Sequence, residues 1–513
     1  MAFFKKTKES QDGSTNNNEP LSKDLLSNVN KLKEVFSYPK NNALKMRDLY
    51  LPFHEKNCTI FFVEGAVDTN LIDTHIVEPL LTKTEASILD SGFINTLIER
   101  VLTTANAKEI ASLPDTIKDL LNGNTIILIE GEQPGISIET AGFENRSVTE
   151  PTTEIVIKGP KSAFIESVSV NRSLIRKQIR DPKLMCEFTS VGERAPLQIS
   201  IMYLEDIADS TIVENVKDRL ANINSDAILT LSTLEQHIEE RSYSLMPSTL
   251  ETERPDRAAS FLLEGHVVLL MENSPSALIV PITFWSLFHT VEDQYLRMLY
   301  GNFIRTIRLV SLLIALFTPA FYIAVTTFHA EMLPTDLMLA ISSARERIPY
   351  PVIIEIIIME VTFEILREAG VRVPTTLGTT IGIVGALILG QAAVQANLVS
   401  PILVIIVAIT GLASFTIPDI SLNIAVRMLR FLFLLTAFLM GFFGLAIFTA
   451  LLIAYLVSIK SFGVPFFAPL SPHFPSSKDM ILRPPVWKQW IRPLSTSPKD
   501  KAREPKPERN TGP

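Results

Sequence analysis

Cysteine is scarce in this sequence, and the common catalytic motifs are missing. The 513-residue chain has two cysteines, Cys58 and Cys186, and no Cys/His cluster has the spacing of zinc ligands. A disulfide framework is therefore excluded, and no metal site is indicated. The sequence contains no Gly-rich phosphate loop and no nucleophile elbow. Its seven histidines are scattered, without a nucleophile or carboxylate at a useful spacing. We expect neither an enzyme nor a bound cofactor.

The chain also has no apolar run near its start and no broad basic surface. Residues 1–20 are polar and lack the apolar core of a signal peptide, so we expect roughly the first 300 residues to stay in the cytoplasm. The net charge is −8, yet residues 471–513 hold nine Lys/Arg against four Asp/Glu. A basic tail beside membrane spans fits an anionic cytoplasmic leaflet. Nucleic acid is not expected as a partner, because the large N-terminal part adds no positive charge.

The N-terminal part contains an internal repeat. Residues 61–80 align with residues 201–220, with Glu64 matching Glu205 and Asp68 matching Asp209. The offset stays between 140 and 142 over more than 60 residues, which predicts two copies of one strand–helix–helix–strand unit. We therefore predict an α/β N-terminal half of the soluble type, built as a tandem duplication, which favours a scaffold or interaction platform. The expected boundaries are a tail and helix at 1–50, units at 51–142 and 199–285, and a basic connecting helix region at 143–198.

Three arginines in the connecting region follow a helical spacing. Arg172, Arg176 and Arg180 stand at i, i+4 and i+8, so they would form a basic stripe along one helix face. Such a stripe is most often a solvated face. The alternative is a contact with phospholipid headgroups or with an acidic partner.

Long apolar runs between residues 286 and 470 predict an α-helical membrane domain with four to five spans, followed by a basic, Pro-rich tail at 471–513. The five apolar segments are 309–328, 351–370, 375–401, 401–418 and 431–458. The arginines that flank them cannot all be cytoplasmic if every segment crosses once, so we expect one segment to be re-entrant or broken.

The segment 351–370 carries acids inside an apolar run. Glu355 and Glu360 have apolar residues on both sides, and a carboxylate in hydrocarbon costs several kcal/mol. This helix therefore lines an aqueous path or only half enters the membrane. Two further acids, Glu364 and Glu368, are expected to pair with Arg367 and Arg372 at an interface.

The segment 375–401 is apolar but divides into two faces when placed on a helix. Polar and large apolar residues gather on one face, and small residues that allow close helix packing gather on the other. The first face predicts a pore lining, with Val384 and Leu387 as an apolar constriction; alternatively, its amides only hydrogen-bond to neighbouring helices. The pore-lining candidates are Thr380, Val384, Leu387, Gln391 and Gln395, and the packing glycines are Gly378, Gly382 and Gly385.

Four blocks of sequence resemble the signature of a known family. They are residues 150–182, 364–378, 381–401 and 460–472, and they resemble the GerA family, more specifically the A subunits of bacterial spore nutrient germinant receptors. The resemblance runs from about residue 51 to residue 472. The family more often has arginine at the position of Lys158 and Arg-Glu-Gly-Phe at residues 161–164.

This resemblance implies a function and a set of partners. The chain would lie in the inner membrane of the endospore, with its N-terminal half on the core side, and would act with a transporter-like B subunit and a C-subunit lipoprotein. It would self-associate, contact membrane lipid, and form an ion-conducting path that nutrients open. Two alternatives stay open: a secondary transporter built on broken helices, and a purely structural subunit that assembles the complex.

Overall fold

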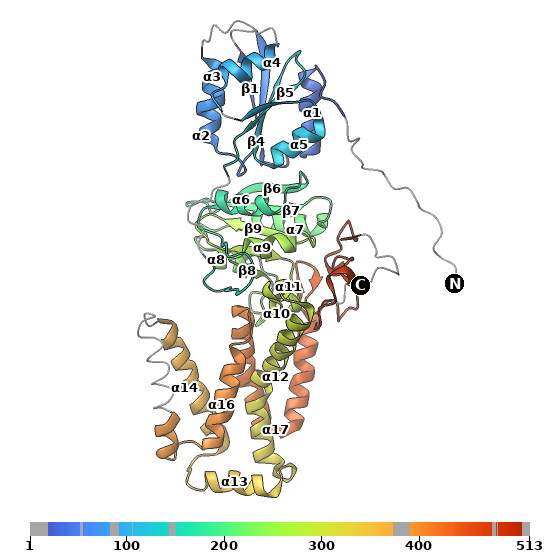
Figure 1. Ribbon diagram of the computed structural model, residues 1–513. Coiled ribbons are helices and arrows are strands. Elements are labelled where there is room, and N and C mark those ends of the chain that lie inside the picture. Colours follow the sequence, from blue (N-terminus) through green and yellow to red (C-terminus); the bar gives the residue numbers. More distant parts are fainter. Residues whose placement is uncertain are drawn as a thin grey trace, which may run out of the picture. The chain divides into compact units, whose positions relative to one another are not determined.

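The computed structural model describes residues 19–51, 55–82, 92–104, 106–142, 150–372, 390–474, 479 and 481–504. The chain divides into two compact units, which are described separately (Figure 1). The N-terminal unit comprises Met1–Ile155, Pro160–Ile238 and Glu251–Ile279. The helical unit comprises Val156–Gly159, Glu239–Leu250 and Val280–Pro513.

The first half of the N-terminal unit is an antiparallel five-stranded sheet in the order β1-β2-β4-β5-β3. Helices α1 and α5 lie on one side of it, and the helical segments 69–81 and 93–101 lie on the other (Figure 1). The elements are α1 (Leu25–Val35), β1 (Leu44–Leu51), β2 (Lys56–Val63), α2 (Thr69–Ile72), η1 (Asp73–Val77), α3 (Glu78–Leu81), α4 (Phe93–Thr96), η2 (Leu97–Val101), β3 (Ala107–Ile110), α5 (Leu113–Leu121), β4 (Asn124–Ile129) and β5 (Gly135–Glu139).

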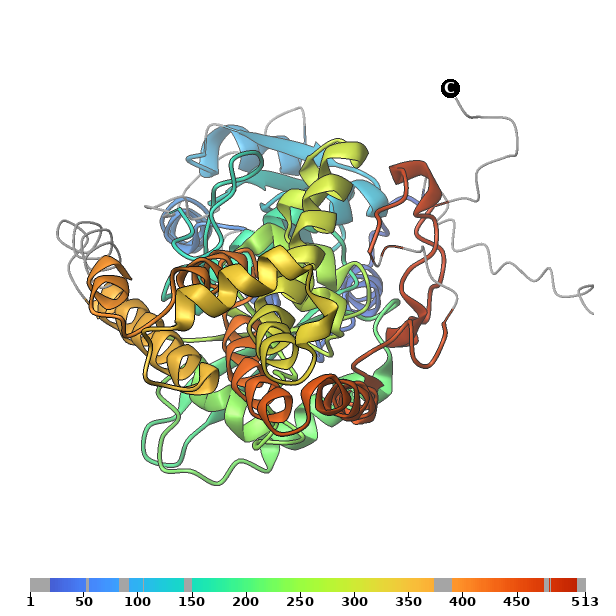
Figure 2. The ribbon, with the colours of Figure 1, turned by 90° about the horizontal axis from the view of Figure 1, so that it is seen from below.

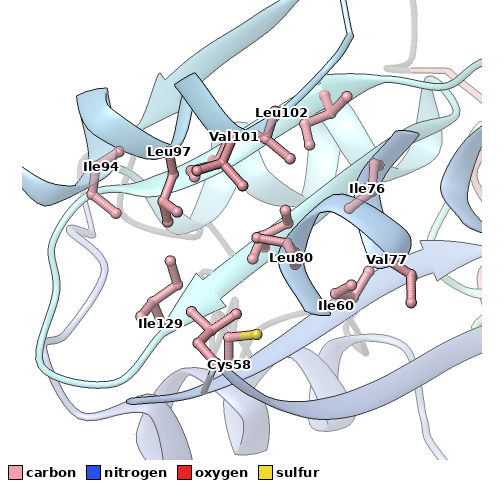
Figure 3. Close-up of a cluster of buried hydrophobic side chains, with 14 of the residues drawn as sticks. Cys58, Ile60, Ile76, Val77, Leu80, Ile94, Leu97, Val101, Leu102 and Ile129 are labelled. Carbon is pink, nitrogen blue, oxygen red and sulfur yellow. The ribbon is translucent and has the colours of Figure 1, made fainter. Parts of the chain in front are cut away.

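The core of this sheet explains why its central strands are continuous apolar runs. Successive side chains of a strand point to opposite faces, and both faces of β2 are covered by helices. Cys58 and Ile60 of β2 pack with Ile76 and Leu80 of the first helical segment and with Leu97 of the second (Figure 3). The amphipathic helices predicted after β2 therefore cover one face of the sheet.

The second half of the N-terminal unit has the same strand order, β6-β7-β9-β10-β8. Its elements are α6 (Val168–Gln178), β6 (Leu184–Val191), β7 (Leu197–Leu204), α7 (Ser210–Ala221), α8 (Leu231–Ile238), β8 (Leu250–Thr252), α9 (Pro255–Leu262), β9 (Val267–Met271) and β10 (Ala277–Val280). Each element occupies the place of its counterpart in the first half, so the predicted tandem duplication is confirmed.

The duplication extends to individual hydrogen bonds. In α1, the Asn28 side chain accepts from the Ser22 backbone N–H at 2.9 Å and donates to its carbonyl at 2.6 Å. In α6, Asn171 makes the same two bonds with Ile165, at 2.8 and 2.6 Å. Gly123 and Gly265, which follow α5 and α9, both have a φ of +91°, which side chains rarely allow. The two copies thus share the asparagine hydrogen bonds at the start of α1 and α6 and the glycine turn after α5 and α9.

The second copy begins earlier than predicted. Helix α6 takes the position that α1 has in the first copy, and β6 pairs with β7 along its whole length. Residues 168–191 are therefore the start of the second copy, and the boundary predicted at residue 199 is wrong.

The helical unit begins with two short helices and continues through long apolar ones. Its helices are α10 (Phe284–Phe288), α11 (Glu292–Tyr295), α12 (Met298–Phe328), η3 (Ala330–Met332), α13 (Thr335–Arg345), α14 (Val352–Arg372), α16 (Pro401–Ser414), α17 (Ile420–Ser458), η4 (Val486–Lys488) and η5 (Leu494–Thr496). Residues 390–395 are also helical, and β11 (Lys460–Ser461) pairs with β12 (Val464–Pro465).

Helix α17 reverses direction at Gly441 and is in effect a helical hairpin. Gly441 has φ 59° and ψ −139°, a conformation that a residue with a side chain rarely adopts. The rings of Phe433 and Phe448 lie 4.6 Å apart, whereas fifteen residues of a straight helix would separate them by about 22 Å. The two halves, 420–440 and 442–458, are visible as neighbouring helices in Figure 2. The predicted single span at 431–458 is therefore wrong.

Two helices of the described residues, α12 and α17, are long and apolar enough to cross a membrane, and α16 is a shorter apolar helix. Helix α14 is continuous over the acidic segment, and its glutamates interrupt the apolar run of that segment. Much of segment 375–401 lies outside the described residues. The number of spans stays a prediction.

Candidate functional site: buried ionic clusters of the helical unit

The predicted pore face falls mostly outside the part of the chain that the structure describes. Thr380, Val384 and Leu387 lie there, as do the packing glycines Gly378, Gly382 and Gly385. Gln391 and Gln395 belong to the helical residues 390–395, and both side chains are exposed. The pore-lining assignment therefore stays a prediction.

The first predicted intramembrane acid, Glu355, joins three segments. It lies in the first turn of α14, is 1% exposed, and accepts a hydrogen bond from Nε of Arg345 in α13 at 3.1 Å. Its other oxygen accepts from the backbone N–H of Ser400, the residue that caps α16, at 3.3 Å. A buried carboxylate needs such partners, so Glu355 holds the starts of α14 and α16 against the end of α13.

The second acid, Glu360, belongs to a larger cluster between α14 and the first half of α17. Glu360 is fully buried, and its carboxylate lies 2.8 Å from an Nη of Arg430, which is 1% exposed. One helical turn further along α14, Glu364 accepts from Arg430 at 3.0 Å and pairs with Arg427. Arg367 of the next turn donates to Ser414 Oγ at 2.6 Å and lies over the Phe415 ring at 4.4 Å. We call Glu360, Glu364, Arg367, Arg427 and Arg430 the α14–α17 cluster.

The pairing of this cluster differs from the one expected. Glu368 pairs with Arg372 at 2.7 Å, as predicted, and both side chains are exposed. Glu364, however, pairs with two arginines of α17 instead of Arg367, because a neighbouring helix brings two guanidinium groups within reach. Spacing along one helix cannot reveal such a partner.

The α14–α17 cluster is neither balanced in charge nor fully hydrogen-bonded. Three arginines face two glutamates, which leaves one positive charge. Within the described residues, Glu360 Oε1, Arg430 Nε and Arg367 Nε are buried without a hydrogen-bond partner. Buried polar atoms in this condition are costly, so the cluster stabilises the fold less than a fully hydrogen-bonded one would.

A second buried cluster lies at the start of α12. Asp293 of α11 is 1% exposed and accepts from Nε of Arg305 at 3.1 Å and from an Nη of Arg308 at 3.0 Å. Arg305 also pairs with Asp479 of the C-terminal tail. Burial by itself raises the pKa of Asp293, but the hydrogen bond and charge of Arg308, with the charge of Arg305, hold this pKa below its ordinary value. We call Asp293, Arg305, Arg308 and Asp479 the head cluster.

Sequence reasoning missed the head cluster. Arg305 and Arg308 are among the arginines that flank the apolar segments, yet both side chains are buried. The partners of Arg305 lie 12 and 174 residues away along the chain, and that of Arg308 lies 15 residues away, so no local pattern marks them.

The basic stripe predicted in the N-terminal unit is also different in the structure. Arg172 and Arg176 lie in α6 but are 5% exposed, and Arg180 lies beyond the end of the helix. Arg172 pairs with Glu64 at 3.1 Å and lies over the Phe188 ring at 4.4 Å. The two buried arginines are thus neither a solvated face nor a free contact surface. Only Arg180 is exposed, and it donates to Asn122 at 2.8 Å.

Burial raises the thiol pKa of Cys186, which lies beside Arg176. Cys186 of β6 is fully buried, and burial raises the pKa of its thiol even though Arg176 and Arg172 act in the opposite direction. The residue is therefore a packed apolar side chain rather than a reactive thiolate.

Comparison with known proteins identifies the family. A family model described as Bacillus/Clostridium GerA spore germination protein matches residues 30–495. This chain belongs to the GerA family of spore germination proteins. The resemblance found in its sequence blocks is therefore confirmed, and its function lies in spore germination.

Individual relatives agree with this assignment. Spore germination protein KA of Bacillus subtilis (strain 168) is 40% identical over 451 residues, which cover 88% of this chain and 82% of that protein. Spore germination protein GerLA of Bacillus cereus is 36% identical over 466 residues, 91% and 94% of the two chains. Stage V sporulation protein AF of Bacillus subtilis is 31% identical over 455 residues, 88% and 91% of the two chains.

A solved structure also matches this GerA family member. It is the N-terminal domain of the A subunit of the Bacillus megaterium spore germinant receptor GerK3, at 24% identity and a TM-score of 0.40, covering 52% of this chain and 98% of that chain. None of these names describes an enzyme. The absence of catalytic activity stays a prediction.

Proposed function

We propose that this GerA family member is a membrane subunit of a nutrient germinant receptor and forms, as an oligomer, an ion-conducting path that opens when nutrient binds. Family membership over residues 30–495 supports the germination role. The proposed site is the inner membrane of the endospore, with the N-terminal unit on the core side. The apolar helices α12 and α17 support the membrane placement.

The observation that carries the channel proposal is the α14–α17 cluster. Glu360 and Arg430 are buried between apolar helices, where ionised side chains are expensive and usually serve an ion or proton path. Helix α14 ends at Arg372, directly before the segment predicted to line the pore. The cluster therefore sets the position from which that segment begins, with Val384 and Leu387 as an apolar constriction that gates by dewetting.

In an ion-conducting path, free carboxylates of Glu355 and Glu360 would favour cations. Both carboxylates are paired with arginines, so neither presents a free negative charge in this arrangement. Cation selectivity would then require the ion pairs to separate on opening, which the unsatisfied polar atoms of the α14–α17 cluster favour.

The receptor would include further subunits. We assign this chain a transporter-like B subunit and a lipoprotein C subunit as partners, together with copies of itself and membrane lipid. The duplicated α/β unit favours an additional assembly role, because it offers two similar surfaces and carries no catalytic motif.

The constriction is tested in spores that carry Val384→Ala or Leu387→Ala. A smaller side chain should leave the constriction hydrated, so ions should leave the spore without nutrient; Val384→Ile and Leu387→Ile, which keep the ring apolar, are the controls. Ion release is measured in the absence and presence of nutrient. Mutant spores that stay dormant and respond normally would overturn the constriction.

The channel and the secondary transporter are separated in liposomes. Purified full-length chain should give unitary conductance in a bilayer if it forms a channel. Saturable solute exchange without unitary conductance would favour the transporter.

A further inference from the structure

The C-terminal tail is attached to the start of α12 by specific polar contacts. The Asn302 side chain donates to the Arg483 carbonyl at 3.0 Å and accepts from the Arg483 N–H at 2.6 Å. The guanidinium of Arg483 is buried and donates to the carbonyls of Asp293, Gln294 and Leu296 at 2.8 to 3.3 Å. With the pair between Arg305 and Asp479, these contacts hold Asp479 and Arg483 beside the first turns of α12.

Large apolar side chains are exposed at this same level. On α12, Leu299 is 72% exposed and Phe303 66% exposed, although they lie before the predicted span begins at residue 309. On the tail, Leu482 and Trp487 are 56% and 50% exposed. We call this surface the interfacial patch: Leu299, Tyr300, Phe303, Leu482, Val486 and Trp487. The hydrogen bonds between Asn302 and Arg483 bring the two segments together, and several exposed apolar groups on neighbouring segments indicate a contact surface.

The length of α12 identifies the environment of this patch. A helix of 31 residues is about 46 Å long. A bilayer is about 30 Å thick in its hydrocarbon core and about 40–45 Å thick with its headgroup regions. If α12 is centred on the bilayer at Leu313, about twenty residues in its middle cross the core, Phe303 lies at the edge of the core and Leu299 lies at the headgroup level. Tyr and Trp are the residues enriched at that level, and the patch contains Tyr300 and Trp487.

The charges around the patch fit the same environment. The tail carries the exposed cations Lys488, Lys499 and Lys501, and anionic lipid headgroups attract such residues. The exposed apolar side chains of α12 also continue without a break from Phe303 through Ile307 and Val310 into Leu313 of the span. The patch is therefore continuous with a face that lipid would already cover.

We infer that residues 481–488 form a membrane-interface anchor, in which Leu482, Val486 and Trp487 insert into the headgroup region of the bilayer at the level of the α12 turns that carry Leu299, Tyr300 and Phe303. The occupant of the patch is lipid, and the tail is fastened to the membrane mainly by apolar side chains, with its lysines in a supporting role. This inference rests on the proposed placement of α12 in a membrane.

The structure offers a direct way to measure the depth of these residues. Both native cysteines, Cys58 and Cys186, are buried, so a nitroxide spin label will attach selectively to a new exposed cysteine. Full-length chain with Leu482→Cys or Trp487→Cys is reconstituted into vesicles of phosphatidylcholine and phosphatidylglycerol. Leu313→Cys, in the middle of α12, reports on the span, and Lys118→Cys, exposed on α5, is the aqueous control.

Collisions of each label with oxygen and with a nickel chelate give its depth. We expect the oxygen-to-nickel ratio at residues 482 and 487 to be several-fold higher than at residue 118 and lower than at residue 313. Labels at 482 and 487 that match residue 118, while residue 313 lies in lipid, would overturn the anchor and leave the membrane placement intact.

Two other results would also overturn the anchor. A second copy of the chain on the patch would shield both labels from oxygen and nickel alike and would broaden their spectra by label–label coupling. A label at residue 313 with the collision ratio of residue 118 would refute the membrane placement as well. The channel proposal is tested separately by ion release.

Discussion

The two buried clusters of the helical unit both pair arginines with carboxylates, but they differ in how completely their polar atoms are hydrogen-bonded. In the head cluster, Asp293 receives hydrogen bonds from both Arg305 and Arg308, and the neighbouring Arg483 donates to three backbone carbonyls. The α14–α17 cluster has three arginines and two glutamates, and it leaves Glu360 Oε1 and Arg430 Nε without hydrogen bonds. A satisfied cluster resists rearrangement, whereas an unsatisfied one lowers the cost of an alternative packing. We therefore expect the packing at the start of α12 to be more stable than the packing of α14 against α17.

The largest loss of stability is expected at the head cluster. Asp293→Ala leaves Arg305 and Arg308 buried without their shared carboxylate, and breaking a buried ion pair in this way costs about 3–5 kcal/mol. Thermal unfolding of the purified full-length chain in detergent measures the loss. Asp336→Ala, at an exposed position of α13, is the control and should leave the midpoint unchanged. Equal unfolding midpoints for the two variants would show that the head cluster does not stabilise the fold.

A smaller loss of stability is expected when an arginine is removed from the α14–α17 cluster, because this cluster already carries one surplus positive charge. Arg430→Met isolates Glu360 and should cost about 3 kcal/mol, the lower end for a broken buried pair. The double variant Glu360→Met, Arg430→Met should recover most of that loss, since apolar groups of similar volume can replace a buried pair. A double-mutant cycle on the free energy of unfolding measures the coupling. Additive losses would mean that the two side chains do not interact.

The first half of α17 lies beside α14, and the turn at Gly441 lets the second half run back in the opposite direction. Gly441→Ala forces a side chain into a conformation reserved for glycine, and its Cβ would lie 3.1 Å from Cβ of Phe328. We expect a loss of about 1–3 kcal/mol, measured by thermal unfolding. Gly463→Ala, at another positive-φ glycine with open space around it, separates backbone strain from the contact with Phe328. Wild-type stability of Gly441→Ala would argue against the hairpin.

The smallest effect is expected at the exposed pair on the same helix as Glu360. Glu368 and Arg372 are both largely exposed, so Glu368→Ala should change stability by about 0.5 kcal/mol or less. At high salt concentration the stability of this variant and that of the wild type should be equal, because exposed charges are screened. A loss as large as that of Arg430→Met would remove the distinction between buried and exposed acids of α14.

Sequence alone predicted the inner strands of the N-terminal unit and missed the outer ones. Strands β2 and β4 are covered on both faces and are therefore continuous apolar runs. Strand β1, at the edge of its sheet, reads Leu-Lys-Met-Arg-Asp-Leu-Tyr-Leu and is half exposed, so it carries no strong pattern. An edge strand is recognised by its partner, which lies elsewhere in the chain.

The candidate site was predicted in part. The acids Glu355 and Glu360 stood out, because carboxylates are rare within apolar runs. Their partners Arg345 and Arg430 could not be assigned, since an ion pair between helices depends on the packing that brings them together. The hairpin in α17 was missed for a related reason: Gly441 lies in a run that remains apolar on both sides of the turn, so hydropathy does not change there.

The sequence by itself determined the family, the duplicated α/β unit and the apolar character of the helical unit, because these depend on periodicity and on residue order. Tertiary structure decided which charges neutralise which, where α17 turns back, and that Arg172 and Arg176 are buried. Those features depend on residues far apart in the chain that come into contact only after the helices and sheets pack.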